Sequence, residues 1–261
     1  MDKRQANKIE SKHITDVGCV RELNEDAIMV TDNLWLLADG MGGHACGEVA
    51  SQLAVETIVK EFGKKQNLVD AIQTAHQKVL KQGKKKKAQK GMGTTIVAAA
   101  CENGSYDVAW VGDSRAYLWD GKKLVQLTED HSLMMRLVNS GLLSMEEASR
   151  HPQRHIITQC LGSLELDRVL VDRISGNWQY GQQLLLCSDG LSDDVTNEEI
   201  SAILKQELGN KDKLNLMVKI AKDKGGKDNI SIVLIDSPVK IENKTPWMKQ
   251  LISKLQGYFN K

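Results

Sequence analysis

Hydrophobic and polar positions along the chain first predict a hairpin and then a pair of helices. Residues 28–38 read IMVTDNLWLLA, two apolar runs with Asp32-Asn33 as the turn between them. Apolar side chains then recur at helical spacing over residues 48–62 and again over residues 68–80. The chain therefore begins with paired strands that are followed by paired helices.

The pattern then changes to short strands that are separated by turn residues. Asn103-Gly104 and Asp120-Gly121 have the composition of hairpin turns. Strand signals cover residues 94–101, 105–111, 115–119 and 123–127, and they return at 169–174, 184–188 and 229–235. Short helices and loop are expected over 132–160, and two further helices over 197–207 and 212–223. Hairpin-paired strands and consecutive helices indicate the α+β class, not the alternation that builds a parallel sheet.

Composition and charge narrow the class of protein. The 261 residues are 41% hydrophobic, enough for a sizeable core. Lysine plus arginine number 35 against 34 acidic residues, so charge gives no sign of a nucleic-acid partner and none is predicted. Five widely spaced cysteines without a C-x-x-C pair suggest reduced thiols. No secretory signal and no run of 18 apolar residues is found, so a soluble, cytoplasmic protein is expected.

Four aspartates share one kind of local surrounding. Asp39, Asp113, Asp189 and Asp228 each lie where an apolar strand meets glycine. One such aspartate is usually a turn former or a helix cap. Four together would repel one another and raise each other's pKa unless a cation offsets their charge. Oxygen ligands without paired His or Cys select Mg²⁺ or Mn²⁺, and a carboxylate that bridges two ions builds a centre for phosphate-ester hydrolysis.

The glycines after Asp39 have two competing explanations. In the first, the Gly40 carbonyl serves as a further metal ligand because no side chain crowds the ion. In the second, the segment 40–45 is a dinucleotide fingerprint, since it satisfies G-x-G-x-x-A between a strand and a helix. The charge of Asp39 beside a pyrophosphate and the lack of alternating β-α-β units weigh against the second.

Seven segments together resemble the bacterial form of the type 2C, metal-dependent protein serine/threonine phosphatases. They occur in family order from about Asp16 to Asp236. The segments are the spaced Asp16, Gly18, Arg21 and Asn24-Glu25-Asp26, then ADGMGGHACGEVAS (38–51), GMGTT (91–95), VGDSRAYL (111–118), LTEDHS (127–132), CSDGLSD (187–193) and GGKDNIS (225–231). The resemblance implies a four-layer α-β-β-α sandwich of two antiparallel sheets flanked by pairs of antiparallel helices, with the metal centre at one end.

The resemblance also implies a role for each matching residue. Asp39 is the expected bridge between two catalytic ions, Mn²⁺ or Mg²⁺, and Gly40 offers its carbonyl to one of them. Asp189 and Asp228 are the expected ligands of the other ion. Asp113 is expected to bind a third, weaker metal ion together with Asp189. Glu25, Asp26 and Asn229 are expected to orient the metal ligands and their waters without binding the ions directly. Arg21 is expected to bind the substrate phosphate.

One departure from the family concerns the acid that protonates the leaving alkoxide. Animal members carry a histidine directly after the Asp-Gly pair, whereas this chain has Met41. His44 or a metal-bound water is left as the candidate. The expected reaction is attack of a metal-bridging water on phosphoserine or phosphothreonine. A bacterial serine/threonine kinase and its targets are the expected partners, and a non-catalytic phosphoprotein-binding module is the alternative.

Two further regions carry weaker expectations. Arg150, His151, Arg154 and His155 either bring positive charge to a substrate or are ordinary loop residues. The C-terminal segment is predicted to form an amphipathic helix that docks on its own domain, on a protein partner or on a membrane surface. The expected divisions are a tail (1–13), the catalytic domain (14–236), a linker (237–245) and this helix (246–261).

Overall fold

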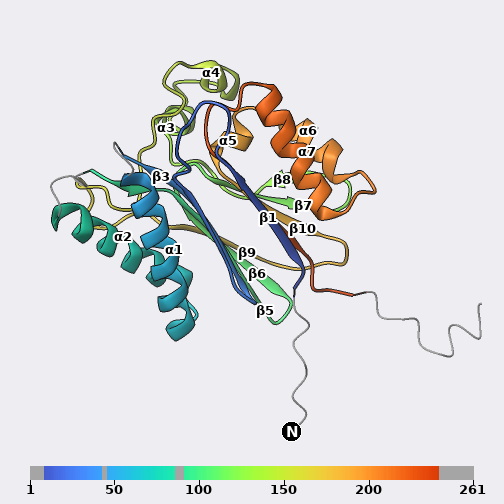
Figure 1. Ribbon diagram of the computed structural model, residues 1–261, viewed down its shortest axis with the longest axis horizontal. Helices are drawn as coiled ribbons and strands as arrows, with labels where there is room; N and C mark the ends of the chain where they lie inside the picture. Colours follow the sequence, from blue (N-terminus) through green and yellow to red (C-terminus); the bar gives the residue numbers. More distant parts are fainter. Residues whose placement is uncertain (1–8, 43–45, 86–90, 241–261) are drawn as a thin grey trace, which may run out of the picture.

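Two antiparallel sheets stacked face to face form the centre of the molecule, and helices cover both outer faces (Figure 1). The computed structural model describes residues 9–42, 46–85 and 91–240. The predicted four-layer α-β-β-α sandwich is confirmed. Within the described residues every strand pair is antiparallel, so the dinucleotide-binding alternative, which needs parallel β-α-β units, is wrong.

The elements occur in the order that the hydrophobic pattern indicates. One sheet runs β1 (Ser11–Asp16), β11 (Ile230–Asp236), β10 (Gln183–Cys187), β7 (Arg115–Trp119) and β8 (Leu124–Gln126). The other runs β2 (Asp26–Val30), β3 (Leu34–Met41), β5 (Ile96–Glu102), β6 (Ser105–Val111) and β9 (Asp172–Asn177), and β4 (Gly93–Thr94) pairs with β3. The helices are α1 (Cys46–Lys65), α2 (Leu68–Lys85), α3 (Leu133–Asn139), α4 (Met145–Arg150), α5 (Asp189–Ser192), α6 (Asn197–Leu204) and α7 (Asn210–Asp223).

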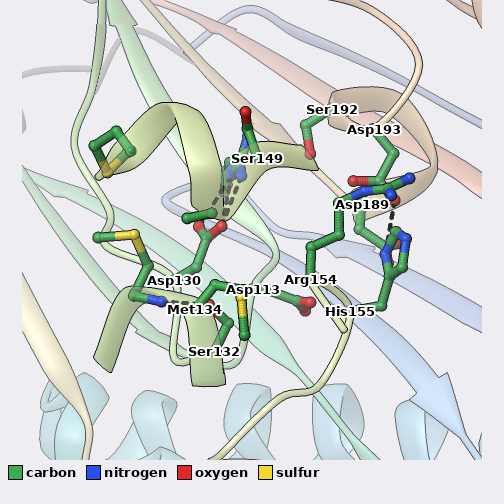
Figure 2. A pocket seen from close by; sticks show the side chains of 14 residues that line it. Asp113, Asp130, Ser132, Met134, Ser149, Arg154, His155, Asp189, Ser192 and Asp193 are labelled. Carbon is green, nitrogen blue, oxygen red and sulfur yellow. Dashed lines mark hydrogen bonds and ion pairs between the residues drawn. The ribbon is translucent and has the colours of Figure 1, made fainter. Parts of the chain in front are cut away.

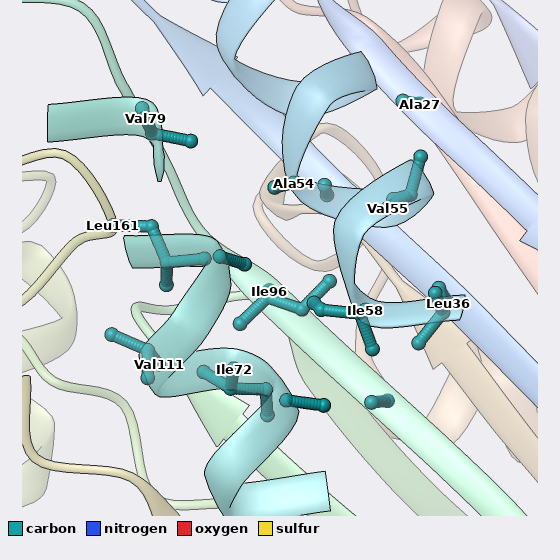
Figure 3. Close-up of a cluster of buried hydrophobic side chains, with 14 of the residues drawn as sticks. Ala27, Leu36, Ala54, Val55, Ile58, Ile72, Val79, Ile96, Val111 and Leu161 are labelled. Carbon is teal, nitrogen blue, oxygen red and sulfur yellow. The ribbon is translucent and has the colours of Figure 1, made fainter. Parts of the chain in front are cut away.

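Central strands are apolar on both faces because both faces are covered. In β10, Leu184 and Leu186 pack between the sheets, whereas Leu185 and Cys187 pack against the layer of α6 and α7. Helices α1 and α2 cover the other sheet and enclose a separate apolar cluster with it (Figure 3). Helices α3, α4 and α5 gather at one end of the sandwich (Figure 1).

Three of the differences from the expected boundaries have a clear cause in the packing. Strand β1 begins at Ser11, so part of the expected N-terminal tail is paired with β11 at the sheet edge. Strand β9 begins at Asp172 rather than at residue 169, because Val169 packs in the cluster under α1 and α2. The expected linker starts against the domain, since the Ser237 N–H donates to the Gln182 carbonyl at 2.9 Å and Val239 packs on the inter-sheet core.

The C-terminal helix predicted over 246–261 lies outside the described residues, as do 241–245 of the linker. Among the helices that the structure describes, none has the length and apolar character needed to cross a membrane.

Candidate metal centre

The four aspartates predicted as metal ligands line one cleft of about 290 Å³ at the end of the sandwich, although they come from separate parts of the chain. Asp39 lies in β3, Asp113 follows β6, Asp189 is the first residue of α5 and Asp228 precedes β11. Arg21, Glu25 and Gly40 line the same cleft. The structure thus brings together the residues that the sequence proposed, while their roles as ligands stay predictions.

Strand β3 continues past Asp39 because its extension has a partner. Gly40 and Met41 pair with Thr94 and Gly93 of β4, so Asp39 lies inside the strand and not at its end as expected. The Thr95 hydroxyl accepts the Asp39 N–H at 3.0 Å, and the Thr94 hydroxyl donates to the Asp39 carbonyl at 2.9 Å. These contacts fix the backbone that carries the central carboxylate.

Glycine at position 40 has a packing reason that differs from the one expected. A Cβ atom there would overlap the backbone carbonyl of Gly47 in α1 and crowd the carbonyl of Glu25. The Gly40 N–H donates to that Glu25 carbonyl at 3.1 Å, and the Glu25 carboxylate accepts the Gly47 N–H at 3.0 Å. Three segments therefore meet at Gly40 without side chains between them.

Asn229 ties the loop that carries Arg21 to the strand that follows Asp228. Its side-chain oxygen accepts the Glu25 N–H at 2.8 Å, and its side-chain nitrogen donates to the carbonyls of Val17 and Leu23 at 3.0 and 2.9 Å. The guanidinium of Arg21 lies 2.6 Å from Asp228 Oδ2. Arg21 is thus beside the predicted centre, on one of its carboxylates.

Two hydroxyl groups that carried no role in the sequence-based prediction connect these segments. Ser188 donates to Asp26 Oδ2 at 2.9 Å and accepts the Ser231 N–H at 3.0 Å, and Ser114 lies 2.8 Å from the Thr95 hydroxyl. The signal for them was present in the CSDGLSD, GMGTT and VGDSR segments. Their positioning function depends on contacts between distant segments, which spacing along the chain does not reveal.

Burial and mutual repulsion perturb the carboxylates. Burial, and then the charges of neighbouring aspartates, raise the pKa of Asp39 and of Asp113 well above the usual value. For the same reasons the pKa of Asp189 is raised to about 6 and that of Asp26 to about 7. The cluster holds more negative charge than its protein surroundings compensate.

Two carboxylate oxygen atoms of this cluster lack a hydrogen-bond donor or a cation among the described residues. Asp26 Oδ1 and Asp189 Oδ1 are buried and have no hydrogen-bond partner in the described part of the chain. A buried, unpaired carboxylate oxygen is costly unless a cation or a proton satisfies it. Clustered oxygen ligands of this kind suit Mn²⁺ or Mg²⁺, so the residues fit the metals that the sequence predicted. His44, one of the two candidates for the general acid, lies outside the described residues.

Known proteins that resemble this chain share both its sequence and its fold. The profile of the protein phosphatase 2C family matches residues 20–231. The serine/threonine phosphatase stp of Listeria welshimeri is 37% identical over 237 residues, which cover 85% of this chain and 93% of the relative. The structure of the Streptococcus agalactiae serine/threonine phosphatase superposes with a TM-score of 0.81 at 35% identity, over 87% of this chain and 99% of the other.

A second similar structure contains metal. It is the catalytic domain of the phosphatase PstP in complex with two manganese ions, with a TM-score of 0.77 at 31% identity, over 87% of this chain and 97% of the other. This chain belongs to the protein phosphatase 2C family. The predicted enzyme class, a bacterial-type protein phosphatase of a family that depends on Mn²⁺ or Mg²⁺, is confirmed.

Proposed function

We propose that this phosphatase hydrolyses phosphoserine and phosphothreonine in proteins, at two divalent ions held by Asp39, Asp189 and Asp228. The observation that carries the proposal is the set of crowded carboxylates that line one cleft. Asp189 Oδ1 in the cleft, and Asp26 Oδ1 behind it, are buried and have no hydrogen-bond partner among the described residues. Such an arrangement costs folding free energy that a purely structural site would not retain. The named activities of the similar bacterial phosphatases support the choice of substrate.

Each residue of the cleft has a proposed part in holding the ions. Asp39 would be a ligand of both ions. The Gly40 carbonyl would be a further ligand of one ion, and Asp189 and Asp228 would be further ligands of the other. Asp113 would share a third ion with Asp189. When bound, the ions supply Lewis acidity that neutralises phosphate charge and lowers the pKa of a coordinated water.

Glu25, Asp26 and Asn229 act behind the ligands. The Glu25 carboxylate fixes the start of α1 through the Gly47 N–H, and Asp26 faces Asp39 across the β2–β3 pair. Asn229 fixes the loop before β2 through its three hydrogen bonds. These groups would hold the ligands and their waters in orientation, a role in which loss of a residue typically costs 10–100-fold, an order-of-magnitude figure.

Arg21 would bind the substrate phosphate. Its contact with Asp228 keeps the guanidinium at the rim of the cleft, where half of the side chain is exposed. The guanidinium of Arg21 carries a planar pair of N–H groups that matches two phosphoryl oxygens, and at the rim of the cleft it would be free to turn from Asp228 to a substrate phosphate.

The biological setting is proposed from the relatives and from the sequence. Phosphorylated proteins are the substrates implied by the named phosphatases, and a serine/threonine kinase with its targets is the proposed source of them. A cytoplasmic location, and docking of the segment 246–261 on its own domain, a protein partner or a membrane surface, stay predictions.

The experiment compares hydrolysis of p-nitrophenyl phosphate and of a phosphothreonine peptide with Mn²⁺ and with excess chelator. Mn²⁺ should support both reactions, and chelator should stop both. Asp228→Asn should lower kcat/KM by more than about 100-fold, because loss of a direct ligand exceeds the cost of an outer one. Asp120→Asn, in the exposed β7–β8 turn, is the matched control and should behave as wild type. Wild-type turnover that continues in chelator would refute the proposal.

A further inference from the structure

His131 is a buried side chain near the metal cleft that has no part in the proposed mechanism. It is only 8% exposed and stands between Asp130 and Ser132. Both neighbours line, together with Asp113, a cavity of about 270 Å³ that adjoins the metal cleft (Figure 2). Asp113 and Asp189 line the cleft and this cavity alike. Because a buried imidazole needs a partner at each ring nitrogen, the contacts of His131 show which segments it holds.

Two hydrogen bonds join His131 to Gly112, the residue directly before Asp113. The Gly112 N–H donates to His131 Nδ1 at 3.2 Å, and the His131 N–H donates to the Gly112 carbonyl at 2.9 Å. Gly112 has a φ of 109°, a conformation that favours glycine, and a Cβ atom there would lie 2.7 Å from the side chain of Thr95. The turn that carries Asp113 is therefore held between Thr95 and His131.

The second ring nitrogen of His131 has an acidic partner. Nε2 lies 3.2 Å from Oδ2 of Asp172, the first residue of β9. Since Nδ1 accepts the Gly112 N–H, the ring proton is on Nε2 and is donated to this carboxylate. Asp172 thus holds the imidazole in the tautomer and the orientation in which Nδ1 faces Gly112.

The main chain of His131 holds a wall of the metal cleft as well. Its carbonyl accepts the Thr158 N–H at 2.7 Å and the Thr158 hydroxyl at 3.0 Å. Ile157, directly before Thr158, lines the cleft and forms a β-bridge with Ser132. His131 therefore contacts three segments at once: the turn before Asp113, the start of β9 and the wall of the cleft.

A histidine that only fills space is the simpler alternative. The ring does pack near Trp110, with the ring centroids 6.4 Å apart, and any side chain of similar size could make that contact. The hydrogen bonds are more demanding, because they require an acceptor on one edge of the side chain and a donor on the other. An apolar replacement would leave the buried Gly112 N–H without its acceptor, which is costly and allows the turn to shift.

We propose that His131 is a positioning residue that fixes the Asp113 carboxylate through the backbone of Gly112. The proposal rests on the proposed function, in which Asp113 and Asp189 share the third and weaker ion. His131 contacts neither the ions nor the substrate in this scheme and acts only through the turn. Loss of the Nδ1 acceptor should therefore weaken the third ion, while the two ions at Asp39 keep their affinity.

Three variants separate the hydrogen bond from the volume of the ring. His131→Leu fills the space without an acceptor, whereas His131→Asn keeps a side-chain oxygen near the place of Nδ1. Asp172→Ala removes the partner of Nε2 at a side chain that is 42% exposed, so its effect on folding should be small. The matched control is His76→Leu in α2, because His76 is also buried and its Nδ1 also accepts a glycine N–H, that of Gly162, at 3.2 Å.

The measurement is Mn²⁺ binding by metal-free protein without substrate, read from the signal of free Mn²⁺ in electron paramagnetic resonance spectra. Wild type and His76→Leu should bind two ions and a third, weaker one. His131→Leu should bind the third ion about 10–100-fold more weakly, with the other two unchanged, as is typical when a residue that orients a ligand is lost. His131→Asn should recover most of this loss, and Asp172→Ala should show a smaller loss than His131→Leu. The Mn²⁺ concentration for half-maximal peptide hydrolysis should shift in parallel.

Binding of the third ion with wild-type affinity in folded His131→Leu would overturn the proposal. The same holds if His131→Asn recovers nothing, or if His76→Leu shows an equal loss, since either result assigns the effect to packing alone. If His131→Leu fails to fold, Asp172→Ala decides, and unchanged binding of the third ion in that variant overturns the proposal. A wild type that binds only two ions would overturn this inference and leave the proposed function standing, whereas hydrolysis in excess chelator would refute the function itself.

Discussion

The space between the two sheets and the cleft at their end are built on opposite principles. Between the sheets, side chains such as Leu37, Val97, Leu186 and Val233 are fully buried and entirely apolar. Where these strands reach the end of the sandwich, carboxylates crowd together with raised pKa values, and two buried carboxylate oxygens have no hydrogen-bond partner among the described residues. The inter-sheet core stabilises the folded state in the absence of any ligand. The crowded carboxylates of the cleft lower the stability of the folded state unless cations are bound.

The contrast between an apolar core and a charged cleft follows from what a metal centre requires of the fold. A centre for metal ions must hold its ligands in place before the ions bind, and that preorganisation requires a rigid support. The apolar strands supply the support, and the glycines at positions 40 and 47 allow the segments to approach closely enough. Substitutions in the two regions should therefore affect stability and metal response in different ways.

The largest expected effect on stability is in the core. Leu186→Ala removes a fully buried side chain between the sheets and should lower the free energy of unfolding by about 2–5 kcal/mol. Urea unfolding with and without Mn²⁺ measures it. The loss should be the same in both conditions, because no metal ligand is disturbed. A loss that Mn²⁺ abolishes would show that core and cleft are not separable as described.

The next effect concerns the phosphate contact. Arg21→Ala should lower kcat/KM on a phosphothreonine peptide by about 10–100-fold, the cost of losing a charged hydrogen-bond pair. KM should change more than kcat if Arg21 binds ground and transition states equally. Arg21→Lys should recover little, since an ammonium cannot make the paired contact. Wild-type kinetics in Arg21→Ala would remove this residue from the proposed mechanism.

The smallest effect is a pH dependence that arises in the cleft alone. Asp26 has a pKa of about 7 in the folded protein against 3.8 ordinarily, so the folded state holds its proton more tightly than the unfolded state. Its contribution to stability is present at low pH and is lost as pH rises from about 4 to about 7. Metal-free wild type should lose on the order of 1–2 kcal/mol relative to Asp26→Asn between pH 5 and pH 7. Urea unfolding at both pH values tests this, and parallel curves for the two proteins would contradict it.

The elements that the sequence predicted best are those with strong apolar patterns. Strands β6 and β7 have the bounds expected, because each carries apolar residues up to a turn glycine or aspartate. Strand β1 escaped prediction, since SKHITD holds a single large apolar residue, Ile14, and lies at a sheet edge. Strand β9 was displaced because Val169 and Val171 pack against the helical layer instead of continuing the strand.

The functional site was also predictable only in part. Asp39, Asp113, Asp189 and Asp228 could be proposed because each residue stands at a local pattern of strand and glycine. The contacts that hold them could not, since Ser188 and Thr95 act through partners 56 to 162 residues away in the chain. The contact between His155 and Asp193 could not be predicted either, because it joins a loop to the end of a helix that is distant in the sequence.

The central claim, that the cleft is a metal centre whose carboxylates destabilise the metal-free fold, is tested most directly by thermal unfolding of wild type and Asp39→Asn at neutral pH. Without metal, Asp39→Asn should unfold at a higher temperature than wild type, because a crowded buried charge has been removed. Saturating Mn²⁺ should reverse that order, since binding at about 100 times Kd adds about 2.7 kcal/mol to the protein that can bind. If Mn²⁺ leaves the wild-type midpoint unchanged, or raises both midpoints equally, the account is contradicted.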